Sequence, residues 1–228
     1  MLSILDVGCG DGQFLKWLPN AYRKVGLDFS YGPLTSLPGV GVQGAVEALP
    51  FPDRSFDLIT AFEVLEHLSE KTFASALREL ERVSRKYIII SVPNREVLAE
   101  SLVWCPRCSC AFHPSWHVRS FDEAALGTLF PDFRMTECRA VGPAARYSGS
   151  RLGILVVLIA RRNPPPVVVC PQCEYSRAAP DSSLEENGRV CSSEPPSLLR
   201  AMFRWLVRTF VFRERRPYWL LATYVRES

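Results

Sequence analysis

Short apolar runs alternate with amphipathic stretches through the first two-thirds of the chain. The apolar runs are mostly rich in β-branched residues and lie near 3–7, 23–27, 56–61 and 86–92. Strands that are buried on both faces of a parallel sheet have this continuous apolar character. Between the last two runs, residues 70–83 carry apolar side chains at helical spacing, which predicts an amphipathic helix.

The same alternation continues further along the chain. Ser120-Phe-Asp-Glu123 has the spacing of a capping box, which predicts a helix running to about Leu129. Residues 134–141 and 151–161 then predict two more strands, paired antiparallel. The β-α-β-α order with a closing hairpin predicts an α/β fold with an open, doubly wound sheet.

The alternation of strand and helix patterns ends at Asn163, which is followed by three prolines at 164–166. Proline breaks helices and stiffens linkers. We therefore predict a core at 1–162, with a cysteine-rich lid insertion at about 100–119, and a C-terminal extension at 163–228. Within the extension, 181–196 is typical of a loop, 197–213 predicts a helix, and 218–225 predicts a final strand.

Composition narrows the class of protein only a little. The chain has 228 residues, 47% of them hydrophobic and 22% charged, with a net charge of +3. These values are ordinary for a globular protein, and so small a charge makes nucleic acid an unexpected partner. The longest apolar run, 153–160, is too short to cross a bilayer, and no leader pattern is visible, so we expect the cytoplasm. Because a core strand begins at residue 3, we expect a start that is truncated relative to similar domains.

A glycine-rich stretch, LDVGCGDG, carries the first candidate chemistry. It ends a predicted strand and opens a helix, with glycines at 8, 10 and 12. Ligands in open α/β sheets bind beyond the carboxyl ends of the strands, where this loop would lie. The dinucleotide fingerprint needs a glycine where Gln13 stands, so that match fails. Asp28 follows the second strand, and its two acceptor oxygens suit a ribose diol.

Five motifs together resemble the class I S-adenosylmethionine-dependent methyltransferases. They are LDVGCGDG, the LD at 27–28, ALPFPDRSFDLI, FEVLEHL and SVPN, in the order and at the spacing of that family. The resemblance covers roughly residues 2–100 and extends more weakly to about 160. It implies a Rossmann-like, mostly parallel seven-stranded sheet and the cofactor S-adenosylmethionine.

The resemblance also implies roles for individual residues. The methionine part of the cofactor would lie beside Asp6, Gly8, Gly10, Phe62 and Glu63; the ribose would bind Asp28; and the adenine would contact Phe29, Ala45, Val46 and Glu47. Many relatives carry an aspartate where this chain has Ala45, so the adenine amino group must find another acceptor, such as the backbone or Glu47.

Transfer of a methyl group from a sulfonium is an in-line displacement to which positioning contributes much of the rate. A base is needed only when the acceptor must lose a proton. His67, in FEVLEHL, and His117, in WHVRSF, are weak candidates for that base. The competing interpretation for both is packing or support of the neighbouring loop.

Two C-P-x-C turns predict a metal site. Cys105 and Cys108 form one turn, and Cys170 and Cys173 form the other. Four thiolates at this spacing favour a closed tetrahedral zinc site, which is structural because no ligand position stays open. Such a site would fasten the lid insertion to the C-terminal extension. The alternatives are a local site in which Cys105 and Cys108 are joined by Cys110, His113 or His117, and free thiols without metal.

The predicted helix at 197–213 is apolar around most of its circumference, with Arg200, Arg204 and Arg208 forming one stripe. Three interpretations stay open: packing on the domain, a homodimer interface, or peripheral contact with a membrane through 197–216. A membrane contact would suit a lipid-linked acceptor.

The sequence therefore predicts transfer of a methyl group from S-adenosylmethionine to an unidentified oxygen, nitrogen or carbon nucleophile. The sequence does not identify the acceptor, which could be a small molecule or a lipid- or glycan-linked compound. The alternatives are a catalytically inactive cofactor-binding module and an RNA-modifying methyltransferase.

Overall fold

The computed structural model describes residues 1–147, 154–155, 163–165, 168–176 and 214–227. The predicted helix at 197–213, the loop at 181–196 and Cys191 lie outside the described residues. Of the predicted strand at 151–161, only Ile154 and Leu155 are described, and both are helical.

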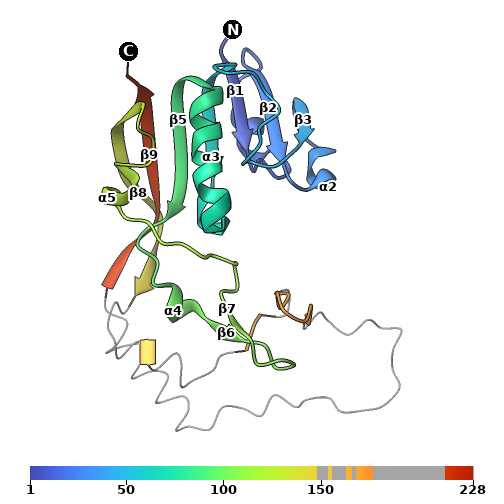
Figure 1. The fold of residues 1–228 in the computed structure, drawn as a ribbon, viewed down its shortest axis with the longest axis vertical. Coiled ribbons are helices and arrows are strands. Elements are labelled where there is room, and N and C mark those ends of the chain that lie inside the picture. Colours follow the sequence, from blue (N-terminus) through green and yellow to red (C-terminus); the bar gives the residue numbers. More distant parts are fainter. Residues whose placement is uncertain (148–153, 156–162, 166–167, 177–213, 228) are drawn as a thin grey trace. The chain divides into compact units, whose positions relative to one another are not determined.

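A seven-stranded sheet forms the centre of the fold (Figure 1). Its order is β3-β2-β1-β4-β5-β9-β8, with bounds β1 Ser3–Val7, β2 Arg23–Asp28, β3 Val40–Gln43, β4 Phe56–Phe62, β5 Ser84–Pro93, β8 Phe133–Tyr147 and β9 Glu214–Arg226. The pairs from β3 to β5 are parallel, and β9 runs antiparallel to β5. This arrangement confirms the predicted Rossmann-like, mostly parallel α/β sheet with an antiparallel closing strand.

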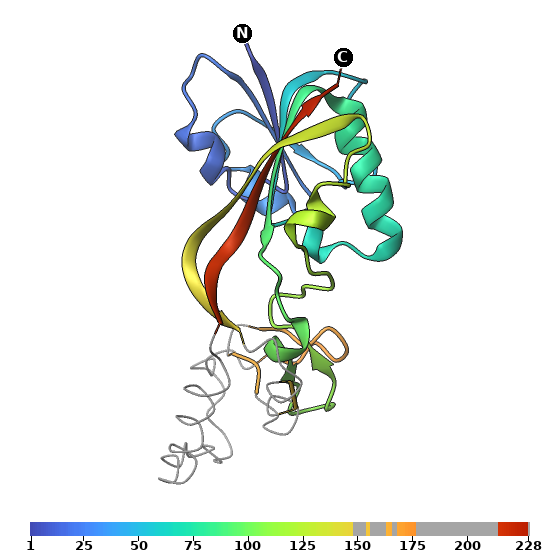
Figure 2. The ribbon, with the colours of Figure 1, turned by 90° about the vertical axis from the view of Figure 1, so that its left-hand side faces the viewer.

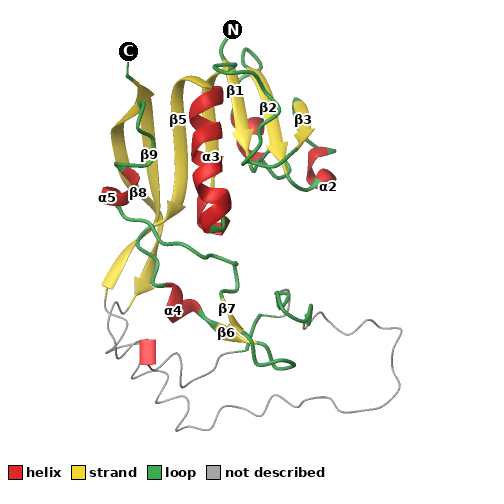
Figure 3. Ribbon diagram, viewed as in Figure 1, coloured by secondary structure: helices red, strands yellow, loops and turns green. Residues whose placement is uncertain are grey.

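Short helices connect the strands. They are α1 Gln13–Trp17, α2 Tyr31–Leu34, the 3-10 helix η1 Leu65–His67, α3 Glu70–Val83, α4 Leu98–Ser101 and α5 Glu123–Leu126. Figure 2 shows α3 along one face of the sheet and the short helices of the N-terminal segment toward the other face. Figure 3 distinguishes the strands of this sheet from the small hairpin of β6 Val103–Trp104 and β7 Ala111–Phe112.

The longest described helix, α3, forms where the apolar spacing predicted it. Ser69 is its N-cap, and its side chain accepts a hydrogen bond from the Thr72 backbone N–H at 3.3 Å. Such a cap satisfies one of the backbone donors that every helix leaves unpaired at its start. Ala76, Leu80 and Val83 are fully buried in the core of the sheet, so α3 is fixed by its apolar face.

The final strand closes the sheet differently from the sequence prediction. The neighbour of β8 is β9 rather than residues 151–161. Along β9, Leu220, Ala222 and Tyr224 are buried, and Ala222 pairs with Ile90 of β5. Both candidate segments are apolar enough for a strand, and only the closed sheet shows which one pairs beside β5.

Two shorter elements also differ from their predictions. The helix expected from Ser120 to Leu129 is the four-residue α5, and its N-cap is Asp122, whose carboxylate accepts from the Ala125 N–H at 2.8 Å. Asp and Ser compete for such caps on nearly equal terms, so local pattern does not decide between them. The strand β3 was not expected, because its sequence VGVQ is short and largely exposed at the sheet edge.

The chain divides into two compact units. The first contains residues 1–96, 118–144 and 216–228, and the second contains 97–117 and 145–215. The predicted domain division at residue 162 stays a prediction, while most of the last strand belongs to the first unit. Within the part of the chain that the structure describes, no helix has the length and apolar content needed to cross a membrane.

Candidate functional site

The glycine loop between β1 and α1 turns through left-handed backbone conformations. Gly8, Gly10 and Gly12 have φ values of 71°, 52° and 76°. A Cβ on Gly8 would lie 2.5 Å from the Val64 side chain, whereas a Cβ on Gly10 would meet nothing within 4 Å. Gly8 is therefore required by packing as well as by conformation, and the backbone at Gly10 stays open to a ligand.

The side chain of Asp28, at the end of β2, is hydrogen-bonded to this loop. Its Oδ2 accepts from the Gly10 N–H at 2.9 Å, and its Oδ1 accepts from the Ser30 N–H at 2.8 Å. Two backbone donors fix the carboxylate while leaving lone pairs for further donors, because a carboxylate has about four acceptor positions. The geometry suits a group that receives two hydroxyls of a ligand.

Asp6, at the end of β1, is buried with 3% of its surface exposed. Its pKa is raised to about 6. Burial is the largest cause, the hydrogen bond from Thr60 partly opposes it, and the negative charge of Asp28 adds to it. The Thr60 hydroxyl donates to Asp6 Oδ1 at 2.6 Å. A buried carboxylate of this kind becomes easier to ionise when a cationic group approaches.

A cavity of about 230 Å³ lies where the resemblance places the adenine. It is lined by Phe29, Gln43, Gly44 and Ala45. Phe29 is 80% exposed, so its ring is accessible to a flat ligand. Val46 is buried in the core and Glu47 is exposed.

The side chain that sequence reasoning missed at this cavity is Gln43. Its Nε2 donates to the Phe29 carbonyl at 3.1 Å, which leaves the amide oxygen as a polar group near Ala45. Gln43 ends a strand too short and too exposed for its pattern to predict, so no signal in the sequence singled it out.

The carboxyl end of β4 carries an acidic group of residues. Phe62 packs edge-on against Phe14 of α1 at 4.9 Å between ring centres. Glu63 has a left-handed backbone, φ 55°, and its Oε1 accepts from the Ser91 hydroxyl at 3.0 Å. Non-glycine residues in that region are rare and collect at ligand sites.

Glu66, three residues further, is fully buried, and neither carboxylate oxygen has a hydrogen-bond partner among the described residues. Its pKa is raised to about 8, mainly by burial and also by the negative charges of Glu63 and Glu96. Its position in FEVLEHL resembles an ordinary surface glutamate of a helix start, so only the folded structure shows its burial.

The two histidines predicted as weak base candidates lie in different compact units. His67 belongs to η1 and has a partly exposed side chain, whose Nε2 lies 4.0 Å from Glu66 Oε1. His117 is buried and stacks on His113 with 4.5 Å between ring centres. His113 Nδ1 accepts from the backbone N–H groups of Ser115 and His117, which supports a packing role for this pair.

The four cysteines of the C-P-x-C turns meet in the second unit. All four sulfur atoms lie within 4.8 Å of one another. Cys105 Sγ is 3.6 Å from Cys173 Sγ, and Cys108 Sγ is 3.6 Å from Cys170 Sγ. Zinc–sulfur bonds of about 2.3 Å in a tetrahedron separate the sulfurs by about 3.8 Å. The spacing therefore fits a tetrahedral metal and is far too long for disulfides.

The two turns have the same backbone geometry. Cys105 donates its N–H to Cys110 O at 2.9 Å and accepts from Ser109 N–H at 2.9 Å. Cys170 donates to Tyr175 O at 2.9 Å and accepts from Glu174 N–H at 3.0 Å. Ser109 and Glu174, at equivalent positions, both have left-handed φ, 58° and 56°. Two copies of one turn present their thiols to a common centre, which random packing of cysteines does not explain.

The thiols of the cluster influence one another's ionisation: the pKa values of Cys108 and Cys173 are raised, and that of Cys170 is lowered. Burial opposes ionisation of Cys170, but the backbone N–H groups of Gln172 and Cys173 and the neighbouring thiols lower its pKa to about 6. Cys110, from the alternative local ligand set, lies outside the four-sulfur group, and its Sγ contacts the Ala111 carbonyl at 3.7 Å.

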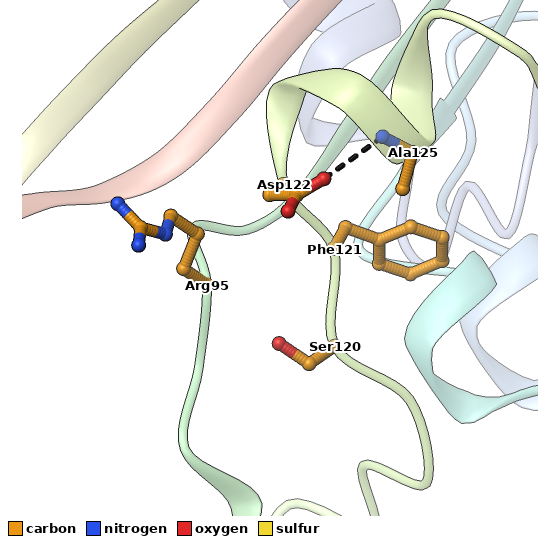
Figure 4. A pocket seen from close by; sticks show the side chains of 5 residues that line it. All are labelled: Arg95, Ser120, Phe121, Asp122 and Ala125. Carbon is orange, nitrogen blue, oxygen red and sulfur yellow. Dashed lines mark hydrogen bonds between the residues drawn. The ribbon is translucent and has the colours of Figure 1, made fainter. Parts of the chain in front are cut away.

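A second cavity, of about 200 Å³, lies in the first unit beyond the carboxyl end of β5. Arg95, Ser120, Phe121, Asp122 and Ala125 line it. Figure 4 shows that the Asp122 carboxylate is turned toward the α5 backbone, with Arg95 on a separate chain segment. The segments are joined by the Arg95 N–H, which donates to Phe121 O at 2.7 Å.

Comparison with known proteins gives the family context for this geometry. Residues 5–90 match the family model of a methyltransferase domain. Over these residues the chain is similar to a methyltransferase domain. The glycine loop, Asp28 and the end of β4 all fall inside the matched segment, and the cysteine cluster and β9 fall outside it.

Curated relatives resemble the same part of the chain. A probable S-adenosylmethionine-dependent methyltransferase of Mycolicibacterium smegmatis is 30% identical over 135 residues, covering 56% of this chain and 49% of the relative. A demethylmenaquinone methyltransferase of Roseiflexus castenholzii is 39% identical over 92 residues, covering 36% of this chain and 37% of the relative. The chain thus spans about half or less of these relatives.

Solved structures share the fold. The YcgJ protein of Bacillus subtilis is 15% identical, with a TM-score of 0.54 and coverage of 100% of this chain and 92% of that one. The [4+2]-cyclase SpnF is 16% identical, with a TM-score of 0.53 and coverage of 99% and 74%. Because the methyltransferase fold also occurs in a cyclase, the fold alone does not fix the reaction.

Proposed function

We propose that this chain transfers the methyl group of S-adenosylmethionine to an oxygen, nitrogen or carbon nucleophile. One observation carries the proposal: the Asp28 carboxylate, fixed by the Gly10 and Ser30 N–H groups, lies beside an open glycine loop. The domain match over residues 5–90 supports the same cofactor.

In this proposal each part of the site binds a different part of the cofactor. Asp28 accepts from the ribose hydroxyls, Phe29 flanks the adenine in the 230 Å³ cavity, and Asp6 lies near the cationic methionine part. Gln43 offers an amide oxygen where Ala45 cannot accept from the adenine amino group. The chain's own contribution to the reaction is positioning, because the sulfonium is already an activated methyl donor.

The test is calorimetric titration of the whole chain with S-adenosylmethionine. We expect micromolar binding, and Asp28→Ala should weaken it by about 1.5–3 kcal/mol, the usual contribution of hydrogen bonds to a charged group. Asp132→Ala is the matched control, since that carboxylate is 72% exposed and pairs with Arg226. Unchanged affinity in Asp28→Ala would remove the ribose assignment.

Turnover needs a separate measurement. Transfer of a labelled methyl group should be screened over small molecules and lipid- and glycan-linked acceptors. Tight binding without transfer to any acceptor class would favour the inactive cofactor-binding module. Transfer to RNA, with binding that weakens steeply as salt rises, would favour the RNA-modifying alternative.

We further propose that Cys105, Cys108, Cys170 and Cys173 hold one structural Zn²⁺. The support is their mutual spacing and the repeated turn geometry. Four thiolates leave no position for a substrate, so the ion would stabilise the second unit without taking part in methyl transfer. A cytoplasmic location, a homodimer and membrane contact through 197–216 stay predictions.

A further inference from the structure

Arg82, near the end of α3, has every donor of its side chain engaged within the chain. Its Nε donates to Glu79 Oε1 at 2.7 Å, and its Nη2 donates to Glu79 Oε2 at 2.8 Å. Further bonds reach the segment between β3 and β4: Nη2 to Leu49 O at 3.0 Å, Nη1 to Phe51 O at 2.8 Å, and Nη1 to Asp53 Oδ1 at 2.8 Å. A guanidinium has about five N–H donors in a rigid plane, so these bonds use all of them.

Glu79 and the backbone of Arg82 hold the same segment at further points. Glu79 Oε2 accepts from the Leu49 N–H at 2.7 Å, so the pair of side chains binds both the N–H and the C=O of Leu49. The Arg82 carbonyl accepts from the Arg54 N–H at 2.8 Å, where the Arg54 backbone is left-handed with φ 49°. Residues 49–54 are therefore fastened to the last turn of α3, whose apolar face is packed in the core.

The turn at residues 45–48 connects this fastened segment to the residue of the proposed ribose site. At the start of the turn, the Gly44 N–H donates to the Asp28 backbone carbonyl at 3.0 Å. Among the residues that the structure describes, neither the Val46 N–H nor the Glu47 N–H donates a hydrogen bond. Backbone donors of this kind need a partner and can find it in a ligand.

An adenine base needs both an acceptor and a donor from its site. Proteins read a base through hydrogen bonds to one edge, which in adenine carries an amino donor beside a ring-nitrogen acceptor. Gln43 offers an acceptor for the amino group, and its Nε2 is held by the Phe29 carbonyl. The donor for the ring nitrogen then falls to the backbone of the turn at 45–48, whose first residue lines the 230 Å³ cavity. Such contacts tolerate misplacement of only about 0.5 Å.

We propose that Arg82 and Glu79 are positioning residues for the adenine end of the cofactor. They act through Leu49, whose backbone they fix at both polar groups, and so they set the turn at 45–48 against the edge of the base. This role rests on the proposed function, because it needs the adenine in the 230 Å³ cavity. A merely structural pair would stabilise the fold without changing which base the site prefers.

The test is calorimetric titration of the full chain with S-adenosylhomocysteine, the demethylated cofactor, and with S-inosylhomocysteine. In the second ligand an oxygen replaces the adenine amino group and the adjacent ring nitrogen carries a proton, so the edge of the base is reversed. We expect the parent to prefer S-adenosylhomocysteine about tenfold or more. Arg82→Gln should weaken S-adenosylhomocysteine about five- to tenfold and leave S-inosylhomocysteine within about twofold. The matched control is Arg78→Gln, one turn earlier on α3, where the guanidinium donates only to Ser75 Oγ; it should keep the preference.

Glu79→Gln keeps the test valid if Arg82→Gln fails to fold. Its amide oxygen can still accept from the Leu49 N–H, while the ion pair with Arg82 is lost, so the preference should fall by a smaller factor. Equal weakening of both ligands, or an unchanged preference in a folded variant, would overturn the positioning role and leave the proposed function intact. A parent that binds both ligands equally would do the same. A parent that binds neither ligand would overturn the proposed function and the positioning role together.

Discussion

The glycine loop and the cysteine cluster differ in how much chain is needed to build each one. The loop and Asp28 come from the first two strands, and the Gly10–Asp28 hydrogen bond spans eighteen residues. The cysteine cluster joins segments separated by more than sixty residues. The loop therefore depends on local backbone conformation, and the cluster depends on distant segments meeting.

The two regions also use different interactions. Around the loop, the strands β1, β2 and β4 bury a shared apolar core that includes Leu5, Leu27 and Ile59. Around the cysteines, the described apolar cluster is small, with Val103 and Phe112 as its buried members besides Cys105 and Cys170. A small core contributes little stability, so a metal ion would be the main interaction that holds the second cluster together.

The largest expected effect is the loss of metal from the cluster. Cys170→Ser removes one of four ligands, and structural zinc sites contribute on the order of 10 kcal/mol to folding. We expect zinc content to fall from one equivalent toward zero and the thermal unfolding temperature to drop. Affinity for S-adenosylmethionine should stay nearly unchanged if the two regions are independent.

The control for that variant is Cys138→Ser, because Cys138 lies on β8 outside the four-sulfur group. Metal analysis and thermal unfolding on the same samples decide the result. Retention of a full zinc equivalent in Cys170→Ser would favour the local ligand set around Cys110 and His113.

A smaller effect should come from the glycine loop. Gly8→Ala places a methyl group 2.5 Å from Val64 at φ 71°, and overpacking together with left-handed strain costs about 2–5 kcal/mol. Gly10→Ala has open space and should cost only about 1–2 kcal/mol from the backbone. Denaturant unfolding of both variants tests this difference, which equal destabilisation would contradict.

The smallest effect concerns pH and Asp6. Its pKa of about 6 lies above the ordinary 3.8, so the folded state holds a proton that the unfolded state releases between these values. Stability from this group is complete below about pH 4 and is lost as pH rises through 6, at most about 3 kcal/mol. Asp6→Asn should flatten this loss in urea unfolding of the cofactor-free chain; an unchanged slope would contradict the prediction.

The sheet itself was largely predictable, and its closing strand was not. Runs such as 56–61 and 86–92 are mainly apolar, which is typical of strands buried on both faces. Residues 151–161 and 218–225 are both apolar, and the order of the sequence favoured pairing 151–161 with the strand at 134–141. The pairing of Ala222 with Ile90 joins residues far apart in the sequence, and local sequence patterns do not predict which of two apolar segments makes such a pairing.

Within the candidate site, predictability followed the same division. The loop glycines and Asp28 were found because their residue types and spacing are tied to backbone conformations that few sequences adopt. Gln43 and Glu66 were missed, because their importance comes from a cavity and from burial. A glutamate in FEVLEHL is expected to be polar and exposed, and only the folded structure buries it.

The sequence by itself determined the α/β class, the glycine loop, Asp28 and the two C-P-x-C turns, since each depends on residues close together in the chain. Only the tertiary structure decided that the four thiols converge, that β9 lies between β5 and β8, and that Glu66 is buried among like charges. The physical reason is range. Backbone conformation is set by neighbours in sequence, whereas burial, charge and ligand geometry are set by segments that meet only after folding.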